Sequence, residues 1–347
     1  MPALLTETQN ELIQIATSLT TNGLKNQRAI LDGEPATSEP TATLMRDFSL
    51  IGLPESIGGE GGSLVDLIVF VEGLSRTVEP GPFVHHVAAL QSAFGAGLEI
   101  GSLIEGGHVA VVGLFEKPGQ RWGEWTDLVV EGKIRARKIG VPFAMLHGPA
   151  VVVGSNNSIG IGTVRSVSHR LGIDPSLDQG DIEVEGLSVN VKHATKDASL
   201  RGALLIAASA IGTARGALNS ASSYAAIRKQ FGQFIGSFQG IAHMLADAFV
   251  DIEAAWSLLL YAGWCVENAS PDSAAAAHGA IAKAGSTAIQ VAERALQVHG
   301  GIGVTWEADS HLYIRRILAL NSLTGSAVSH YRALGAHLTI ASMGAVC

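Results

Sequence analysis

The order of local sequence patterns along the chain, helical, then strand-like, then helical again, restricts its fold more than any other feature. Residues 4–100 place apolar side chains at helical spacing, whereas residues 106–195 alternate apolar and polar side chains as strands do. After Leu200 the sequence is Ala-rich, and Gly and Pro breakers divide it into long helical segments. We place these segments at about 199–228, 237–268, 272–299, 308–320 and 325–343.

This order predicts a mainly α protein with a central β domain. We expect an N-terminal helical domain over residues 1–105, a small β-barrel-like domain over 106–197, and a C-terminal four-helix bundle over 198–347.

Local signals agree with this division. Thr6 and Ser63 are each followed three residues later by Gln or Asp, which is the spacing of a capping box at a helix start. Glu131-Gly132 and residues 155–158 separate alternating stretches, as the turns of β-hairpins do.

The composition excludes some classes of protein and indicates a hidden surface. Hydrophobic residues make up 47% of the 347 residues, so the chain has ample apolar material for a folded core. Charged residues make up only 16%, against about 25% in an average soluble domain. We therefore expect part of the surface to be covered by a partner chain. A net charge of −8 argues against a nucleic-acid partner.

Cysteine usage and hydropathy indicate a cytoplasmic protein. Only Cys265 and Cys347 are present, which excludes a disulfide framework and favours a reducing compartment. The N-terminus shows no signal-peptide pattern. The longest apolar runs, 202–213 and 254–266, are shorter than the ~20 residues of a membrane span, so we expect buried helices and no membrane.

Two features that resemble ligand sites favour ordinary structure instead. The Gly-rich stretch 53–62 lacks the Gly-Lys-Ser/Thr of a phosphate loop, so a helix-connecting loop is favoured. The twelve histidines include the adjacent pair His85-His86, but none has metal-site spacing around an acid, so we expect no metal.

Two clusters carry more specific chemistry. Arg228 begins Arg-Lys-Gln-Phe-Gly, and Gln297 begins Gln-Val-His-Gly-Gly-Ile-Gly. An Arg beside a glycine turn can bind a phosphate through two hydrogen bonds, and adjacent glycines let a ligand approach the backbone closely. Each cluster alone also fits a surface Arg or a Gly-rich helix end.

Together, in this order and on this helix–strand–helix layout, the clusters resemble the acyl-CoA dehydrogenase family. The family pattern has Arg-x-x-Phe-Gly, a Gln eleven residues after the Arg, and a later Gln-x-x-Gly-Gly-x-Gly. Gln239 stands eleven residues after Arg228, as the pattern requires. The stretch 53–61 and the continuation Gly303-Val304-Thr305-Trp306-Glu307 are also similar to the family.

The resemblance implies a flavoprotein that desaturates an acyl-CoA thioester between Cα and Cβ and passes electrons to an electron-transfer flavoprotein or a similar acceptor. In this family a glutamate removes the α-proton and FAD takes the β-hydride. The Arg, Phe, Gln and Gly-Gly residues reach across a subunit interface to the pyrophosphate and adenosine of the neighbour's FAD. The implied FAD-binding residues are Arg228, Gln230, Phe231, Gln239, Gln297, Gly300 and Gly301.

The catalytic glutamate of the family is missing from both of its known positions. Aligned from the Gly-Gly pair, with Arg315 at the family Arg, the first position is Thr324. The second lies twenty-six residues before Arg228, at Gly202, and the adjacent Arg201 offers no carboxylate. The sequence therefore predicts no catalytic residue in this chain.

The β domain also departs from the family. Phe115-Glu116-Lys117-Pro118 stands where the family has Thr-Glu-Pro, and 139–142 after Lys138 lacks the family's Trp-x-Thr beside the flavin ring. The motifs that are present, around Arg228 and Gln297, would serve a neighbour's FAD. The residues that are missing would serve the chain's own FAD and substrate. We therefore expect a non-catalytic subunit whose partner is a catalytic paralogue. The family includes bacterial α2β2 heterotetramers that act on CoA esters of steroid side chains and related bulky acids.

Two alternatives remain open. The chain could be a self-sufficient flavoenzyme whose base has moved to Glu307 or Asp309, acids that also suit a helix start. It could instead be a scaffolding protein with no flavin role. Arg315-Arg316 replaces a common Arg-Asp pair, either as an interface or CoA-phosphate contact or as a solvated helix face. His299, inside the Gly-rich turn, either lines the adenosine pocket or packs against the protein.

Overall fold

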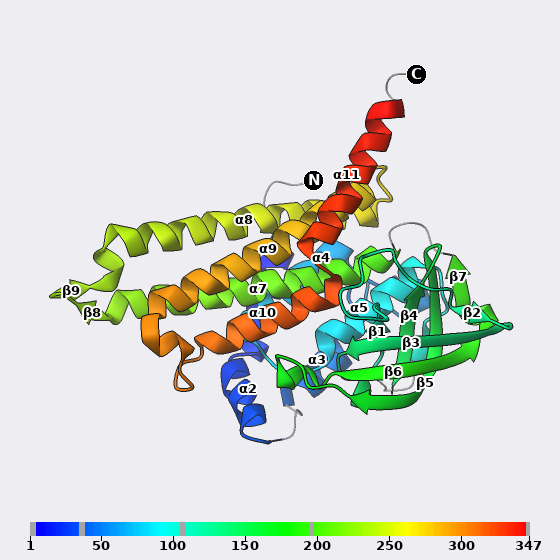
Figure 1. The fold of residues 1–347 in the computed structure, drawn as a ribbon, viewed down its shortest axis with the longest axis horizontal. Helices are drawn as coiled ribbons and strands as arrows, with labels where there is room; N and C mark the ends of the chain where they lie inside the picture. The colour runs from blue at the N-terminus through cyan, green and yellow to red at the C-terminus, as the bar shows by residue number, and fades with distance from the viewer. Residues whose placement is uncertain (1–4, 35–38, 105–108, 147, 194–197, 345–347) are drawn as a thin grey trace.

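The computed structural model describes residues 5–34, 39–104, 109–146, 148–193 and 198–344 (Figure 1). Helices occupy both ends of this chain and strands occupy its middle. The N-terminal helices are α1 (Glu7–Leu19), α2 (Gly23–Leu31), α3 (Glu39–Asp47), α4 (Leu64–Ser75), α5 (Phe83–Gly95) and α6 (Gly101–Ile104). The C-terminal helices are α7 (Ala198–Ile227), α8 (Gln239–Glu267), α9 (Ser273–His299), α10 (Ser310–Thr324) and α11 (Ala327–Gly344).

The local helix signals in the N-terminal part are confirmed. Thr6 and Ser63 both form capping boxes, at the starts of α1 and α4. The Gly-rich stretch 53–62 lies between α3 and α4 and contains the short 3-10 turn Glu55–Ile57 and an isolated β-bridge between Leu53 and Gly61, so it is a loop between helices, as predicted.

A mixed sheet forms the middle of the chain. Its hydrogen-bonded order is β1-β4-β5-β6-β3-β2, with β7 paired to β5, and β1 with β4 is the parallel pair. Both predicted hairpins form, with Glu131 and Gly132 at positive φ between β2 and β3, and Asn156 and Asn157 at positive φ between β4 and β5. The strands are β1 (Val111–Gly113), β2 (Val129–Val130), β3 (Lys133–Val141), β4 (Pro149–Gly154), β5 (Ser158–His169), β6 (Gly180–Leu187) and β7 (Val191–His193).

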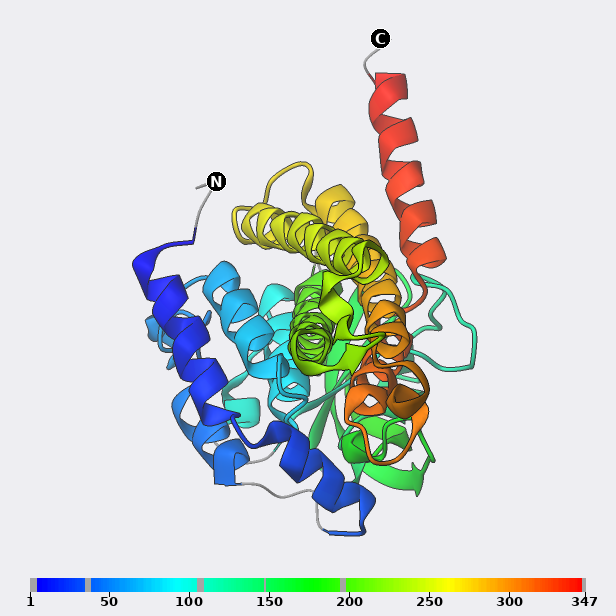
Figure 2. The same cartoon turned by 90° about the vertical axis from the view of Figure 1, so that its left-hand side faces the viewer.

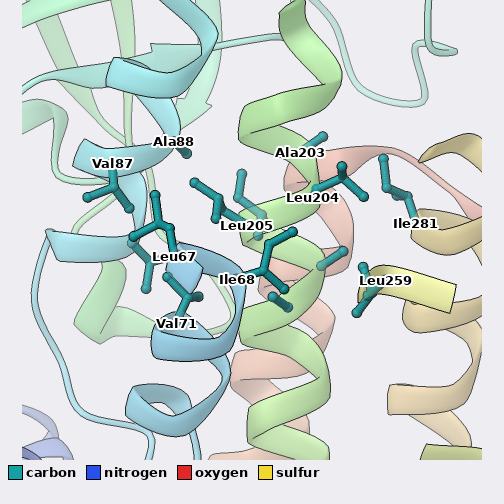
Figure 3. Close-up of a cluster of buried hydrophobic side chains, with 14 of the residues drawn as sticks. Leu67, Ile68, Val71, Val87, Ala88, Ala203, Leu204, Leu205, Leu259 and Ile281 are labelled. Carbon is teal, nitrogen blue, oxygen red and sulfur yellow. The ribbon is translucent and has the colours of Figure 1, made fainter. Parts of the chain in front are cut away.

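The long helix α7 is the centre of the core. It packs against α4 and α5 on one side and against α8, α9 and α10 on the other. Figure 3 shows this packing, with Leu67 and Ile68 of α4 facing Leu204 and Leu205 of α7, and Ile281 of α9 beyond them. Each of these five side chains is at most 2% exposed. Burial of such a continuous apolar seam is the main favourable term in folding.

Helix α8 is long and apolar enough, by length and composition, to cross a membrane. Half of its most apolar stretch is buried inside the protein, where it packs against α7 and α9. This placement is typical of the core helix of a folded domain, so the length and apolar character of α8 are weak evidence that it spans a membrane. Cys265 on this helix is buried and free, and Cys347 lies outside the described residues.

Helix α11 projects from the body of the protein (Figures 1 and 2). The buried histidine pair His278–His330 holds its first turns against α9. His330 Nε2 lies 2.7 Å from the carbonyl oxygen of Thr324, and its Nδ1 lies 2.8 Å from Nδ1 of His278 on α9. The Trp122 ring packs on His330, and His337 stacks on His278. The pair links α9, α10, α11 and the β1–β2 connection.

This histidine pair predicts acid lability. Burial, followed by the neighbouring His330 and His337, lowers the pKa of His278 to about 3, and burial lowers the pKa of His330. The unfolded chain, with an ordinary histidine pKa of about 6.5, takes up protons that the folded chain does not. Stability therefore falls as the pH drops below about 6.5, by up to about 1.4 kcal/mol per pH unit for each such histidine.

Urea unfolding between pH 7.5 and 5 measures this slope. We expect the His278→Gln variant to have a shallower dependence on pH. His243→Gln, an exposed change on α8, is the matched control and should leave the slope unchanged. Equal slopes for wild type and His278→Gln would contradict the prediction.

Candidate functional site

A hollow of about 660 Å³ lies where α7 ends, α8 begins and α9 ends. Residues as far apart in the sequence as Tyr224 and Gly301 meet there because α7, α8 and α9 run side by side as long helices. Six of the seven predicted site residues line it: Arg228, Gln230, Phe231, Gln297, Gly300 and Gly301. The seventh, Gln239, is the exposed first residue of α8 and lies outside this lining, between Phe238 and Gly240, which belong to it.

The hollow has the features of a phosphate site. Within the described part of the chain, the Arg228 guanidinium has no hydrogen bond or ion pair, so it is free to bind an anion. Helix α8 starts at the hollow, and its N-cap residue Phe238 forms no side-chain cap, which leaves the first backbone N–H groups to a ligand. Among described atoms, a Cβ added at Gly300 or Gly301 would meet nothing within 4 Å, so the backbone there is open to close approach.

A strained hairpin projects beside this hollow. Its strands are β8 (Lys229–Gln230) and β9 (Gln233–Phe234), and Phe231 and Gly232 between them both have positive φ, at 51° and 81°. Positive φ is costly for a residue with a Cβ. The Phe231 side chain is nevertheless 93% exposed, and its ring lies edge-on to Phe238 with 6.3 Å between the ring centroids. Such a strained, exposed aromatic is typical of a contact made to another molecule.

Replacement of Phe231 should separate folding from assembly. Asparagine tolerates positive φ, so Phe231→Asn should raise the free energy of unfolding of the isolated chain by about 1 kcal/mol. The same change should weaken association with a partner subunit. Urea unfolding and analytical ultracentrifugation measure the two effects. An isolated chain that is destabilised by Phe231→Asn would show that the ring contributes to folding.

A second hollow, of about 540 Å³, lies between the sheet and the α10–α11 junction, beside Thr324. Phe115, Ile139, Leu323 and Gly325 are among its lining residues. Phe115 occupies the space over Gly325, where an added Cβ would lie 3.2 Å from its ring. No indole or hydroxyl side chain stands at 139–142, where the resemblance noted in the sequence implies support for a flavin ring, so these residues do not fit such a ring.

The first base position that the resemblance assigns has no acid. Thr324 there is 3% exposed, its hydroxyl lies 3.5 Å from the carbonyl oxygen of Asn321, and its own carbonyl accepts the hydrogen bond of His330. In the adjoining sheet, Lys138 is fully buried and donates to Glu116 at 2.8 Å. Burial lowers the pKa of Lys138, and the ion pair with Glu116 partly offsets this.

The second base position is closed by packing. A Cβ added at Gly202 on α7 would lie 2.4 Å from Ser92 Oγ and 2.5 Å from the carbonyl oxygen of Ala88 on α5. No side chain fits in that space without movement of α5. The nearby cavity between α7 and the sheet, lined by His85 and Ile206, has a volume of about 10 Å³. That is roughly what one water molecule needs, and far less than an acyl chain needs.

The proposed replacement acids lie at the wrong end of the bundle. Glu307 and Asp309 precede α10, whereas Thr324 ends it, and a 15-residue helix is roughly 22 Å long. Asp309 is paired with Arg28 of α2 at 2.5 Å, and Glu307 is exposed. Neither acid reaches the base position. Within the described residues, no group of three or more His, Cys, Asp or Glu could hold a metal ion.

The expectations for Arg315-Arg316 need correction at Arg316. This residue is neither a solvated surface residue nor free for CoA. Its side chain is 7% exposed and pairs at 2.5 Å with Asp174, which is fully buried. Although burial opposes it, the Arg316 charge, with hydrogen bonds from Ser176, Arg316 and Gln27, holds the pKa of Asp174 below its usual range. The cluster joins α2, the β domain and α10, so its role is structural.

Comparisons with known proteins agree with this architecture. The family model "Acyl-CoA dehydrogenase, C-terminal domain" matches residues 194–339. The acyl-CoA dehydrogenase IpdE2 of Mycobacterium tuberculosis is 31% identical over 270 residues, which cover 76% of this chain and 74% of that protein. The chain therefore belongs to the acyl-CoA dehydrogenase family.

Solved structures show the same fold. The ChsE4–ChsE5 complex from Mycobacterium tuberculosis matches with a TM-score of 0.83 at 20% identity, covering 98% of this chain and 99% of that one. A variant of the Tcur3481–Tcur3483 steroid ACAD matches with a TM-score of 0.78 at 25% identity, covering 97% and 99%. Proteins of this family depend on FAD.

Proposed function

We propose that this chain is the non-catalytic subunit of a heteromeric acyl-CoA dehydrogenase and completes the FAD site of a catalytic paralogue. One contrast carries the proposal. The hollow beside Arg228 is open and its guanidinium is unpaired, while the place of a catalytic glutamate at Gly202 is filled by α5. The chain has the residues that would bind a neighbour's cofactor, but it lacks the catalytic glutamate that its own chemistry would need.

This chain's residues would act by binding and orientation. Arg228 and the N-terminus of α8 would hold the pyrophosphate, and Gly300 and Gly301 would let the adenosine approach the backbone. The exposed Phe231 would contact the partner subunit. Bound FAD supplies hydride acceptance, and the partner supplies the base, the acyl-CoA site and the flavin-ring pocket. We propose an electron-transfer flavoprotein or a similar acceptor downstream, and a cytoplasmic location.

The likeness to the ChsE4–ChsE5 complex and to the steroid ACAD supports both an assembly of two kinds of subunit and a bulky acyl group. The low charge of the chain, 16%, also suits a surface that is covered in a heterotetramer.

The test is flavin stoichiometry. We expect the chain expressed alone to purify with little flavin and no dehydrogenase activity. Coexpression with a paralogue that carries the missing glutamate should give a complex with about one FAD per pair of subunits. Absorbance at 450 nm against protein concentration measures the ratio. A homomer with one FAD per chain that oxidises an acyl-CoA would overturn the proposal.

A further inference from the structure

Helix α11 is attached to the body of the protein by polar and aromatic contacts rather than by the hydrophobic core. Of its described side chains, none belongs to a hydrophobic core cluster, whereas α7, α8, α9 and α10 all contribute to one. Its outer side carries Val328, Tyr331 and Leu338, which are 57%, 47% and 60% exposed. Its inner side buries Ser329 and His330. An element with few buried apolar contacts can open without unfolding the rest of a protein.

The connection between α10 and α11 provides a hinge. Helix α10 ends at Thr324 and α11 begins at Ala327, and Gly325 between them has a φ of 89°. Glycine adopts this conformation without strain, and it has the widest freedom to leave it. Figures 1 and 2 show α11 leaving the body of the protein from this end of α10. A change in the dihedral angles of Gly325 would therefore swing α11 as a rigid rod.

The hydrogen bonds of the histidine pair fix where its protons lie. The Thr324 carbonyl only accepts, so His330 Nε2 carries a proton and donates it over 2.7 Å. The lone pair of neutral His330 is then on Nδ1, and it accepts from Nδ1–H of His278 over 2.8 Å. A proton added at His330 Nδ1 would set two N–H groups against each other. His330 can therefore become charged only when the pair has separated.

The surroundings of the pair do not favour its charged form. Its neighbours are Trp122 from the β1–β2 connection and His337 from α11, and among the described residues no carboxylate is an electrostatic partner of either histidine. Burial is the main cause of the low pKa of both histidines, about 3 for His278. Release of α11 would restore an ordinary histidine pKa of about 6.5. The released state then takes up protons that the docked state does not, so it becomes more populated as the pH falls below about 6.5.

We propose that α11 is an acid-released arm, which pivots at Gly325 away from α9 while the rest of the helical core stays folded. The His278–His330 pair is its latch, and the docked arm is the state at neutral pH. This release differs from an overall loss of stability in acid, because the opening is confined to one helix. It does not rest on the proposed function, since none of these residues lines the hollow beside Arg228.

Hydrogen exchange of the full chain at pH 7.5 and pH 5, with rates converted to protection factors, tests the proposal. We expect the amides of residues 331–337 to be less protected than those at the centre of α7, by roughly tenfold or more. Their protection should fall between the two pH values by roughly thirtyfold for each released histidine, the factor that a pKa of about 6.5 gives. Equal protection of 331–337 and α7 would overturn the proposal, since α11 would then open only by global unfolding.

The His330→Gln variant tests the latch itself. The glutamine amide can donate to the Thr324 carbonyl and accept from His278, so it keeps both hydrogen bonds, but it cannot take up a proton. The fall in protection of 331–337 should therefore be about thirtyfold smaller than in wild type. His243→Gln, an exposed change on α8, is the matched control and should show the wild-type fall. If His330→Gln also shows the wild-type fall, the histidine pair is not the latch and the proposal is wrong.

Discussion

We expect replacement of Arg228 with alanine to lower the affinity of the proposed heteromeric complex for FAD by about a hundredfold. The expected loss is about 3 kcal/mol, because a guanidinium can make two charge-assisted hydrogen bonds to the pyrophosphate. The C-termini of α7 and α9 also lie at the hollow, and their dipoles disfavour an anion. The Arg228 charge must offset them. Fluorescence titration of the flavin-free complex with FAD measures the effect.

Two variants sharpen this experiment. Arg228→Lys keeps the charge but not the fork of donors, so its affinity should lie between those of wild type and Arg228→Ala. Arg165→Ala removes an exposed arginine on β5 and should change nothing. A complex that retains its FAD after Arg228→Ala would show that the chain is a scaffold without a flavin role.

We expect the Gly202→Ala variant to lose about 3 kcal/mol of folding free energy and Gly202→Glu not to fold stably. The added Cβ would lie 2.5 Å from the Ala88 carbonyl oxygen, and overpacking against backbone cannot be relieved by a rotamer change. Urea unfolding of the isolated chain measures the difference from wild type.

Gly279→Ala is the matched control, since it makes the same change inside α9. There the added Cβ would have only an ordinary contact, 3.6 Å from Leu334 Cδ2. Helix propensity alone then favours alanine by about 0.5–1 kcal/mol, so this variant should be more stable than wild type. A stable Gly202→Glu variant that gained dehydrogenase activity would show that the acyl site is not closed.

The sequence predicted the parts of the fold that depend on nearby residues. The observed α7 (Ala198–Ile227) and α9 (Ser273–His299) lie within two residues of the segments 199–228 and 272–299. Helical periodicity and capping are local signals, so they are visible without tertiary information. The parallel pairing of β1 with β4 joins separate segments and had no such signal.

The same reasoning explains the errors at individual residues. Arg316 was expected at the surface because its partner, Asp174, is 142 residues away and has no motif. The His278–His330 pair spans 52 residues and was likewise missed. Six of the site residues line one hollow because their motif fixes both spacing and helix ends, whereas Gln239, the first residue of α8, is not among the lining residues.

The contact between α5 and α7 would make the proposed division of roles between a catalytic and a non-catalytic subunit hard to reverse. With glycine at position 202, α5 and α7 pack closely against each other. The volume that a glutamate and its substrate would need is therefore filled by packed atoms. A glutamate at position 202 would require α5 to move together with its own core contacts. A single substitution at position 202 would therefore not restore a catalytic acid there. In the proposed heteromer, the packing that stabilises this chain would therefore also keep it dependent on its catalytic partner.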